Sequence, residues 1–553
     1  MSKNSPLKFI AISGTTGATE NLYIYEYEND ILIVDCGVGF PDADMFGVDL
    51  VIPDFTYLKE NKQKIRGLIV THGHEDHLGA IPFLLKEIPK VPIYATRLTI
   101  GFIKDKLADH GIKGELHEFN SEKDILKLGV FKVTPFRVSH SVPDGVGLAI
   151  DTPEGMCFHV PDYKFDWTSV DKKPFDITKA ALLASNGVLS LASDALGSTN
   201  PGHTESESVL EDRIENIVSR SQGRVFFTTI SSNISRMQQA LNVAQRNGRQ
   251  VVFIGRSMDA KADIAKKLGY LHYPQHLVVT PHKARNIKKD QLMYIISGCY
   301  GQPSSALYKA TVGDHKFLQI DGTDTVIFSA DPAPPGSKVN VDYLVDRLFE
   351  LGVDVHYYDL QEDLHVSGHG SQEDIKFLFG LVKPKFFIPI GGTIRHMKAY
   401  SKIAQAMGAT PSQILELTPG DVIEFKDGGG RRGKKVSARD IMVDGLGVGD
   451  VGNIVLRDRQ ILAKDGFVIV TIQIDRETGK LIERPEIISR GFVFEKDQKD
   501  LLVDASIRLE KSLSGKKKLQ AHAVKGRVVE ELESFFFKRI ERRPMIIPVV
   551  IEI

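Results

Sequence analysis

Apolar runs closed by polar residues recur along the N-terminal part of the chain and predict buried strands. The runs at 31–34 and 67–70 are short and branched, and they end in Asp35 and Thr71. Later runs predict further strands at 131–138, 156–160 and 189–193. The polar residues at the ends of these later strands are His140, Asp162 and Asp194. We therefore expect a rigid scaffold of strands that presents polar groups on its loops.

From residue 206 to residue 360 the pattern changes to compact units in which a strand is followed by a helix. Apolar runs predict strands at 225–230, 251–254, 294–296 and 326–328. Such alternation indicates a parallel sheet with binding loops at the carboxyl ends of its strands. The loop after the first of these strands contains Ser232 and Asn233. Hydroxyl and amide groups suit the binding of a phosphate, and they are equally common in ordinary turns.

The rest of the chain combines another strand with a separate tail. The strand at 385–390 leads into a loop at 391–396. Residues 426–436 are basic and rich in glycine, which predicts a flexible linker. The tail from 460 to 553 contains strands and an amphipathic helix around 498–513. We therefore expect a small α/β domain at the end of the chain.

Size and composition restrict the class of protein. With 553 residues the chain exceeds the size of a single core, so roughly two to four domains are expected. Its 42% hydrophobic and 25% charged residues are ordinary for a soluble protein and argue against disorder. The net charge of −1 means that any contact with nucleic acid must come from local basic patches.

Cysteine usage and hydropathy indicate the compartment. The three cysteines, Cys36, Cys157 and Cys299, lie far apart, so neither a disulfide framework nor a CxxC metal site is expected. The first residues lack the apolar core of a signal peptide, and no apolar run reaches about 18 residues. We therefore expect a cytoplasmic protein without a membrane span.

The most informative segment is Thr71–Gly79, which reads THGHEDHLG. Its members His72, His74, Asp76 and His77 place three imidazoles and a carboxylate within six positions. Zinc accepts such ligands, and burying them without a partner would cost about a few kcal/mol each. A solvated histidine-rich loop is the alternative. The HxHxDH spacing at a strand end favours two adjacent metal ions.

Two other strand ends would complete a two-metal centre. His140 and Asp162 are the ligands that the HxHxDH motif lacks, and a carboxylate suits the bridging position between metals about 3.5–4 Å apart. His140 could equally be a plain turn residue. Asp35 could orient a metal-bound histidine from behind, or it could accept N–H groups of a neighbouring loop.

Together these motifs resemble those of a known group of nucleases. The HxHxDH motif with His140 and Asp162 is similar to the metal motifs of the metallo-β-lactamase fold. Asp194 and the segment 365–370, HVSGHG, resemble the additional motifs of the β-CASP nucleases. Segments of the tail resemble the ribonuclease J family specifically, at 444–453, 487–492 and 542–545. The likeness covers nearly the whole chain.

The resemblance implies an α/β protein. A metallo-β-lactamase αββα sandwich would carry an inserted β-CASP α/β domain and a small C-terminal α/β domain. Residues 1–205 and 361–425 would form the sandwich, with the β-CASP domain at 206–360 between them. A linker at 426–459 would lead to the C-terminal domain at 460–553. RNA would enter between the sandwich and the inserted domain.

The implied activity is that of a zinc-dependent ribonuclease. Such a phosphodiester hydrolase acts as an endonuclease and as a 5′-to-3′ exonuclease that favours a 5′ monophosphate, in rRNA processing and mRNA decay. The implied partners are RNA, further copies of the chain in a homodimer or homotetramer, and other RNA-decay proteins. Two alternatives stay open. One is a DNA-directed β-CASP nuclease, and the other is a weakly active RNA-binding subunit of a nuclease complex.

The resemblance also implies roles for residues of this chain. One Zn²⁺ would be held by His72, His74 and His140, and a second by Asp76 and His77, with Asp162 bridging. The residues implied in catalysis are Asp76, Asp194 and His369. Of these, His369 would contact the scissile phosphate or assist the leaving group. The residues implied in binding the 5′ phosphate are Ser232, Asn233, His365 and Ser367.

The chain departs from the family pattern at three places. Gly391 stands where the family has a histidine ligand, residues 13–21 differ from the usual first loop, and Pro161 replaces glycine before the bridging acid. Because glycine has no side chain to bind a metal, we expect the second zinc to bind more weakly. His396 and His203 are the candidates for the vacant position.

Overall fold

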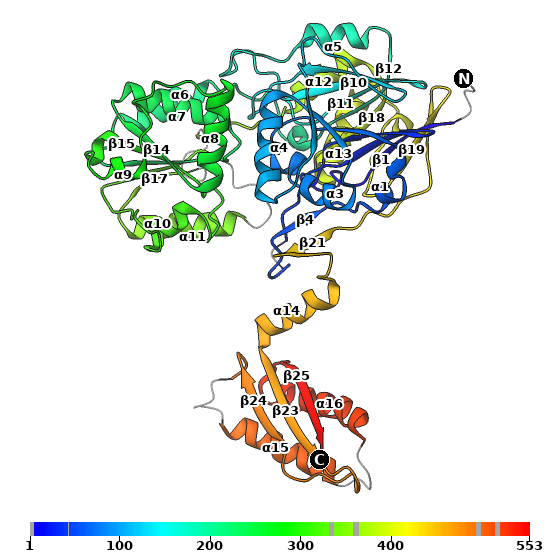
Figure 1. Cartoon of the computed structure of the whole chain (residues 1–553), viewed down its shortest axis with the longest axis vertical. Coiled ribbons are helices and arrows are strands. Elements are labelled where there is room, and N and C mark those ends of the chain that lie inside the picture. Colours follow the sequence, from blue (N-terminus) through cyan, green and yellow to red (C-terminus); the bar gives the residue numbers. More distant parts are fainter. Residues whose placement is uncertain (1–4, 43, 331–336, 358–363, 494–498, 515–519) are drawn as a thin grey trace. The chain divides into compact units, whose positions relative to one another are not determined.

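The computed structural model of the chain describes residues 5–42, 44–330, 337–357, 364–493, 499–514 and 520–553 (Figure 1). The chain forms two compact units. The first is Met1–Phe40 with Leu50–Ile441, and the second is Pro41–Asp49 with Met442–Ile553. The first unit contains two sheets packed face to face and a separate parallel sheet, and the second contains a three-stranded sheet.

Two sheets form a sandwich in the first unit. The larger has the strand order β20-β19-β1-β2-β3-β5-β6-β7. Its strands are β1 (Leu7–Ala11), β2 (Tyr23–Tyr27), β3 (Asp30–Val34), β5 (Ile65–Ile69), β6 (Pro92–Ala95), β7 (Glu115–Glu118), β19 (Val422–Lys426) and β20 (Gly429–Arg432). The smaller has the order β18-β12-β11-β10-β9-β8. Its strands are β8 (Leu126–Leu128), β9 (Phe131–Arg137), β10 (Val146–Thr152), β11 (Gly155–Val160), β12 (Val188–Asp194) and β18 (Pro384–Ile390).

The core of the sandwich lies between the two sheets. It runs from Tyr25 and Leu32 on the larger sheet to Leu148 and Ile388 on the smaller one. Helices cover the outer faces. α4 (Arg97–Asp109) packs on β6 and β7, next to α3 (Ile81–Glu87), while α5 (Ile177–Ala184), α12 (Gln372–Val382) and α13 (Ile394–Ala406) cover the smaller sheet. This arrangement confirms the predicted αββα sandwich.

Parallel pairing brings the polar strand ends together. β3 and β5 pair in parallel, so Asp35, after β3, lies beside Thr71, after β5. β11, β12 and β18 form another parallel set. Asp162, Asp194 and Gly391 therefore lie at the ends of three neighbouring strands. Groups that are remote in sequence share one edge of the sandwich because the carboxyl ends of parallel strands point the same way.

A parallel sheet forms the inserted part of the first unit, as predicted. Its order is β14-β15-β13-β16-β17. Its strands are β13 (Val225–Thr228), β14 (Gln250–Ile254), β15 (Leu292–Ile296), β16 (Thr325–Phe328) and β17 (Asp354–His356). Figure 1 shows α6 (Val209–Val218) and α7 (Ile234–Arg246) on one face, and α10 (Ala306–Val312) and α11 (Ser337–Glu350) on the other. α8 (Arg256–Leu268) follows β14.

The second unit is a small α/β structure, which agrees with the pattern of the tail. Its strands β23 (Phe467–Ile474), β24 (Glu486–Arg490) and β25 (Met545–Glu552) pair in the order β24-β23-β25. α15 (Lys499–Ser514) and α16 (Ala521–Ile540) bury one face of this sheet. α15 coincides with the predicted amphipathic helix. No helix among the described residues is long and apolar enough to cross a membrane.

The predicted linker at 426–436 is wrong over most of its length. β19 continues to Lys426, and β20 at Gly429–Arg432 pairs with it as a hairpin. Gly428, with φ of +72°, makes the tight turn between the two strands. Ion pairs of Arg431 with Glu424 and of Arg432 with Asp421 neutralise the basic residues. The other domain boundaries stay a prediction.

Candidate metal centre

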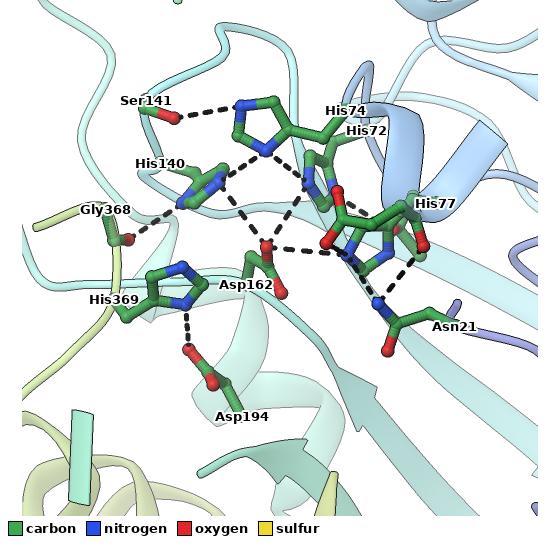
Figure 2. Close-up of polar contacts among 12 residues, drawn as sticks. Asn21, His72, His74, His77, His140, Ser141, Asp162, Asp194, Gly368 and His369 are labelled. Carbon is green, nitrogen blue, oxygen red and sulfur yellow. Dashed lines mark hydrogen bonds and ion pairs between the residues drawn. The ribbon is translucent and has the colours of Figure 1, made fainter. Parts of the chain in front are cut away.

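Five segments meet at the edge of the sandwich where the parallel strands end (Figure 2). The loop after β5 leads into α2 (Glu75–Leu78) and carries the HxHxDH residues. His140 follows β9, and Asp162 follows β11. Asp194 ends β12, and His369 lies on the loop before α12. The structure therefore brings together all the metal and catalytic residues that the sequence predicts.

The first ligand group consists of His72, His74, His140 and Asp162, whose ligand atoms all lie within 4.8 Å of one another. His74 Nδ1 lies 3.1 Å from His72 Nε2 and 3.0 Å from His140 Nε2. Asp162 Oδ2 lies 3.4 Å from His72 Nε2 and 3.5 Å from His140 Nε2. Figure 2 shows the three rings and the carboxylate converging on one point. A metal ion there would find three nitrogens and one oxygen.

The second nitrogen of each ring faces an oxygen. His72 Nδ1 lies 3.1 Å from Thr71 Oγ1, and His140 Nδ1 lies 2.8 Å from the carbonyl oxygen of Gly368. A carbonyl oxygen can only accept, so Nδ1 of His140 carries the proton. The inward Nε2 atom then keeps its lone pair, as a metal-ligating imidazole requires.

The electrostatics of the first ligand group suit a cation. Burial, and then the neighbouring imidazoles, hold the pKa values of His74 and His140 well below the ordinary range. Burial alone would raise the pKa of Asp162, but His77 and His369 hold it well below its usual value. Neutral imidazoles beside a carboxylate leave lone pairs facing one another, which a shared cation would stabilise. The donor set therefore fits a divalent metal ion.

The second ligand group consists of Asp76, His77 and Asp162. His77 Nε2 lies 3.5 Å from Asp76 Oδ2 and 3.4 Å from Asp162 Oδ2. Asp162 belongs to both groups, which is the position expected of a bridging carboxylate. Only these three side chains contribute to this group within the described part of the chain.

Asp35 performs both of the functions that the sequence left open. Its Oδ2 lies 2.8 Å from His77 Nδ1, so it orients the ring from behind. Its Oδ1 accepts a hydrogen bond of 2.8 Å from the main-chain N–H of Thr71 at the start of the ligand loop. Asp35 has a φ of +62°, which is uncommon for a residue with a side chain and typical of functional sites.

Asn21 is a residue of the centre to which the sequence gave no role. Its Nδ2 lies 3.2 Å from His77 Nε2, and its main-chain N–H donates to the carbonyl oxygen of Asp76 at 3.0 Å. The hydroxyl of Tyr23 lies 2.8 Å from Asn21 Oδ1. The amide therefore faces the second ligand group. No local signal could identify it, because only the fold brings residue 21 to residue 77.

Gly391 follows β18 with a φ of +66°. A Cβ atom added there would lie 3.5 Å from Asp194 Oδ1. His396, a candidate for the vacant position, accepts a hydrogen bond from the main-chain N–H of Thr393 and caps α13. The other candidate, His203, lies 3.5 Å from Asp374 on α12. Neither histidine belongs to a ligand group, so the second group has no fourth donor among the described residues.

His369 lies next to the first ligand group. Its Nδ1 is 2.7 Å from Asp194 Oδ2, and its ring centroid is 5.2 Å from that of His140. Asp194 Oδ1 accepts a hydrogen bond of 2.8 Å from the main-chain N–H of Leu196, which fixes the carboxylate. Burial alone would lower the pKa of His369, but Asp194 and Asp162 raise it to about 9.

The predicted phosphate-binding residues lie on two loops. Ser232 and Asn233 are buried after β13, and Asn233 Oδ1 accepts from the main-chain N–H of Arg236 and caps α7. His365 and Ser367 lie on the loop that leads to His369, and Ser367 Oγ accepts from the N–H of His369 at 3.1 Å. The structure thus places the second pair beside the metal centre and uses Asn233 as a helix cap.

A buried network joins the two loops. Arg236 donates to Ser329 Oγ at 2.6 Å, and Ser329 Oγ donates to the carbonyl oxygen of Leu364 at 2.9 Å. His365 follows Leu364, and burial, then Arg236 and Lys164, lower the pKa of His365 to about 3. Its Nδ1 is buried without a hydrogen-bond partner among the described residues. These contacts hold the two loops together, and the Nδ1 atom of His365 is available for a ligand.

Comparison with known protein families gives three matches. A metallo-beta-lactamase superfamily profile matches residues 15–157. A profile for the beta-CASP domain of ribonuclease J matches residues 222–348, and one for the ribonuclease J C-terminal domain matches residues 454–553.

Similar proteins are found over the whole length of the chain. Ribonuclease J2 of Bacillus subtilis is 36% identical over 553 residues, which cover 99% of each chain. Ribonuclease J 1 of Streptococcus pyogenes is 36% identical over 554 residues, covering 99% of this chain and 98% of the relative. A crystal structure of a protein of unknown function from Enterococcus faecalis shares the fold, with a TM-score of 0.53 and 14% identity. It covers 76% of this chain and 100% of that chain.

Proposed function

Because the chain belongs to the ribonuclease J family, with its metallo-β-lactamase fold, we propose that it is a metal-dependent ribonuclease that hydrolyses RNA phosphodiester bonds. The observation that carries this proposal is the convergence of the first ligand group on one point. Its four donors come from three different segments of the chain. The contacts described above for the outer ring nitrogens hold the imidazoles in place. Such preorganisation is typical of a catalytic metal site.

The metal proposed for the first ligand group is zinc, held by His72, His74, His140 and Asp162. Three imidazoles and a carboxylate form a common zinc donor set. When bound, zinc would act as a Lewis acid, lowering the pKa of water and neutralising charge on phosphate oxygens. The second ligand group would take the second ion with Asp76, His77 and the shared Asp162.

The residues of the chain would position the substrate and move a proton. Asp194 holds Nδ1 of His369, so Nε2 is the atom that can contact the scissile phosphate or the leaving oxygen. Asp35 likewise contacts Nδ1 of His77 and orients this ring in the second ligand group. Asp76, Asp194 and His369 are therefore the residues that we propose for catalysis, together with the metal ligands.

We propose a 5′-to-3′ exonuclease that also cuts internally, for RNA processing and decay in the cytoplasm. A preference for a 5′ monophosphate is supported by the buried Nδ1 of His365, which has no hydrogen-bond partner among the described residues and lies on the loop that leads to His369. A pocket for a single phosphate would reject a triphosphate by size and charge. Equal rates of exonucleolytic digestion on 5′-monophosphorylated and 5′-triphosphorylated RNA would contradict this preference.

The decisive experiment compares cleavage of RNA and DNA of the same sequence by the zinc-loaded chain and by a variant with both His72→Ala and His74→Ala. We expect the natural chain to cleave RNA and the variant to lose cleavage and the zinc of the first ligand group. Preferential cleavage of DNA would support the DNA-directed alternative, since the metal chemistry does not itself require a 2′-OH. Binding of RNA without cleavage would support the weakly active subunit, which the missing donor of the second group favours.

The tail is proposed to mediate association into a homodimer or homotetramer. The face of β25 opposite α15 and α16 exposes Ile547, Val549 and Ile551. Apolar side chains in such a row are typical of a protein–protein interface. Light scattering of a chain that ends at Ile441 should give a mass lower than the deleted residues alone explain. An unchanged number of subunits would remove this role from the tail.

A further inference from the structure

Trp167 is the single tryptophan of the chain, and its side chain is 64% exposed. Its ring stacks on Phe165, with centroids 6.2 Å apart and planes at 22°. The edge of Phe377 supports it from the side, with centroids 6.3 Å apart and planes at 82°. The indole is therefore held by two other rings while much of its surface meets water. A supported, exposed aromatic plane is the kind of group on which nucleobases stack.

A surface hollow of about 530 Å³ lies beside this indole. Much of its lining consists of groups that form hydrogen bonds, namely Thr168, Ser169, Ser208, Gln238 and Asn242. Thr168 Oγ1 lies 2.8 Å from Ser206 Oγ and 3.1 Å from Ser208 Oγ, so the hydroxyls are held together. An aromatic plane next to hydroxyl and amide groups suits a nucleoside, which has a flat base and a polar sugar.

The charges at the hollow favour an anion. Lys172 lines the hollow and is exposed, and no ion pair joins it to another side chain in the described part of the molecule. The acid of the lining, Glu211, is paired with Arg246 at 2.6 Å and accepts from Asn242 at 3.0 Å. The negative charge is therefore compensated within the protein, while the positive charge remains available for a phosphate.

The hollow shares lining residues with two other hollows, one of which reaches the metal centre. Ser169 and Val170, which line it, also line a narrow hollow that reaches His140. Lys172 and Gln238 also line a larger hollow of about 730 Å³ between the sandwich and the inserted sheet. Val170 borders all three. The segment 167–172 therefore links the surface beside Trp167 to the surface beside His140.

We propose that Trp167 and the hollow beside it form a binding subsite for single-stranded RNA. One base would stack on the indole, the hydroxyl and amide groups would contact its sugar and edges, and Lys172 would contact a backbone phosphate. The inference rests on the proposed function, because RNA bound at the metal centre is what brings a base to this subsite. The subsite would lengthen the footprint of the enzyme on its substrate.

The fluorescence of the natural chain tests the subsite, because Trp167 is the only tryptophan. A single-stranded RNA about 12 nucleotides long, added to the full chain in the presence of a chelator that prevents cleavage, should quench the fluorescence and shield the indole from iodide. A duplex of the same sequence should not quench, because its bases are already paired. Trp167→Ala should weaken binding of the single strand about 5- to 150-fold, and Trp167→Phe should retain most of the affinity.

Two further variants provide the controls. Leu182→Ala removes another exposed apolar side chain, which does not line the hollow, and should bind RNA as the natural chain does. Lys172→Ala should reduce the slope of log affinity against log salt by about one. Circular dichroism of each variant checks that the fold is retained.

Two results would overturn the subsite: RNA binding without quenching, and natural affinity in Trp167→Ala. Neither would affect the proposed ribonuclease activity, which is measured separately with zinc. Tighter binding of DNA than of RNA of the same sequence would overturn the assignment to RNA. Absence of RNA cleavage together with normal quenching would overturn the proposed function and leave the subsite in place.

Discussion

The main-chain N–H of Gly391 donates a hydrogen bond of 2.8 Å to the carbonyl oxygen of Gly14. This contact joins the loop after β18, which carries Gly391, to the loop at 13–21, and both are places where the sequence departs from the family pattern. The hydroxyl of Tyr23 lies 2.7 Å from the same carbonyl and continues the network to Asn21. The two departures thus form one structural feature beside the second ligand group.

The second ligand group should bind zinc more weakly than the first. It has three donors within the described residues, whereas the first has four. Because loss of a supporting contact alone costs about 10- to 100-fold in affinity, loss of a direct donor should cost at least that. Stepwise chelation followed by metal analysis should remove one zinc ion well before the other. Two ions released together would contradict this expectation.

Gly391→His tests the same expectation by adding a donor. The Cβ atom has room, but the φ of +66° costs a residue with a side chain about 1–2 kcal/mol. We therefore expect tighter binding of the second zinc with a lower melting temperature. Gly391→Ala is the matched control, since it carries the strain without the imidazole.

Asn21→Asp should also strengthen the second ligand group. The amide nitrogen lies 3.2 Å from His77 Nε2, so a carboxylate at this position adds an anionic oxygen next to a ligand atom. We expect the second zinc to bind at least about 10-fold more tightly, as measured by competition with a chelator. Asn21→Ala should not strengthen binding. Equal affinities in all three forms would show that residue 21 does not face the metal.

His369→Ala should lower kcat for RNA cleavage by about 10²- to 10⁴-fold while leaving the zinc content unchanged. The reason is that His369 belongs to neither of the two proposed zinc groups, although it forms a third cluster of possible ligands with Asp162 and Asp194. Asp194→Asn should lower kcat less, because it loosens the ring without removing it. In the double variant the effects should not add, since both act through one hydrogen bond. Loss of zinc from His369→Ala would reassign the residue as a ligand.

Glu207→Ala should destabilise the chain by about 3–5 kcal/mol, because it leaves the buried guanidinium of Arg236 without its carboxylate. The pair has an N···O distance of 2.8 Å, and both side chains are buried. Asp263→Ala is the control, since its pair with Lys267 is exposed and worth at most about 1 kcal/mol. Urea unfolding measures the free energy of unfolding of both variants. Similar losses of stability in the two variants would contradict this prediction.

Acid should destabilise the fold partly through His159. This ring is buried in the sandwich, with Nδ1 3.2 Å from the hydroxyl of Tyr25, and Nε2 has no hydrogen-bond partner in the described part of the chain. Burial lowers its pKa to about 4, below the unfolded value of about 6.5. The unfolded chain therefore binds a proton that the folded chain excludes. This contribution to stability is complete above pH 6.5 and falls by about 3 kcal/mol as the pH drops from 6.5 to 4.

The variant His159→Phe isolates this effect from other titrating groups. Its unfolding free energy should fall less steeply than that of the natural chain between these pH values, while the two curves run parallel above pH 7. Identical slopes would show that His159 does not carry the acid sensitivity.

Much of the centre was accessible from sequence because its ligands follow buried strands. The apolar runs before Asp35, His140, Asp162 and Asp194 predicted that these groups end strands of one scaffold. The HxHxDH spacing then predicted a metal site by local chemistry alone. The same reasoning failed at 426–436, because charge and glycine content indicate flexibility while hairpin pairing depends on a strand far away in sequence.

The sequence by itself determined the ligand types, the strands that carry them and the absence of a side chain at Gly391. Tertiary structure decided which of these groups lie close enough to share a metal, that Asn21 faces His77, and that Trp167 borders a hollow sharing Ser169 and Val170 with the one that reaches His140. The reason is physical. Backbone periodicity and side-chain chemistry are local properties, whereas a donor set and a binding surface depend on how parallel strands and inserted helices bring distant residues within a few ångströms.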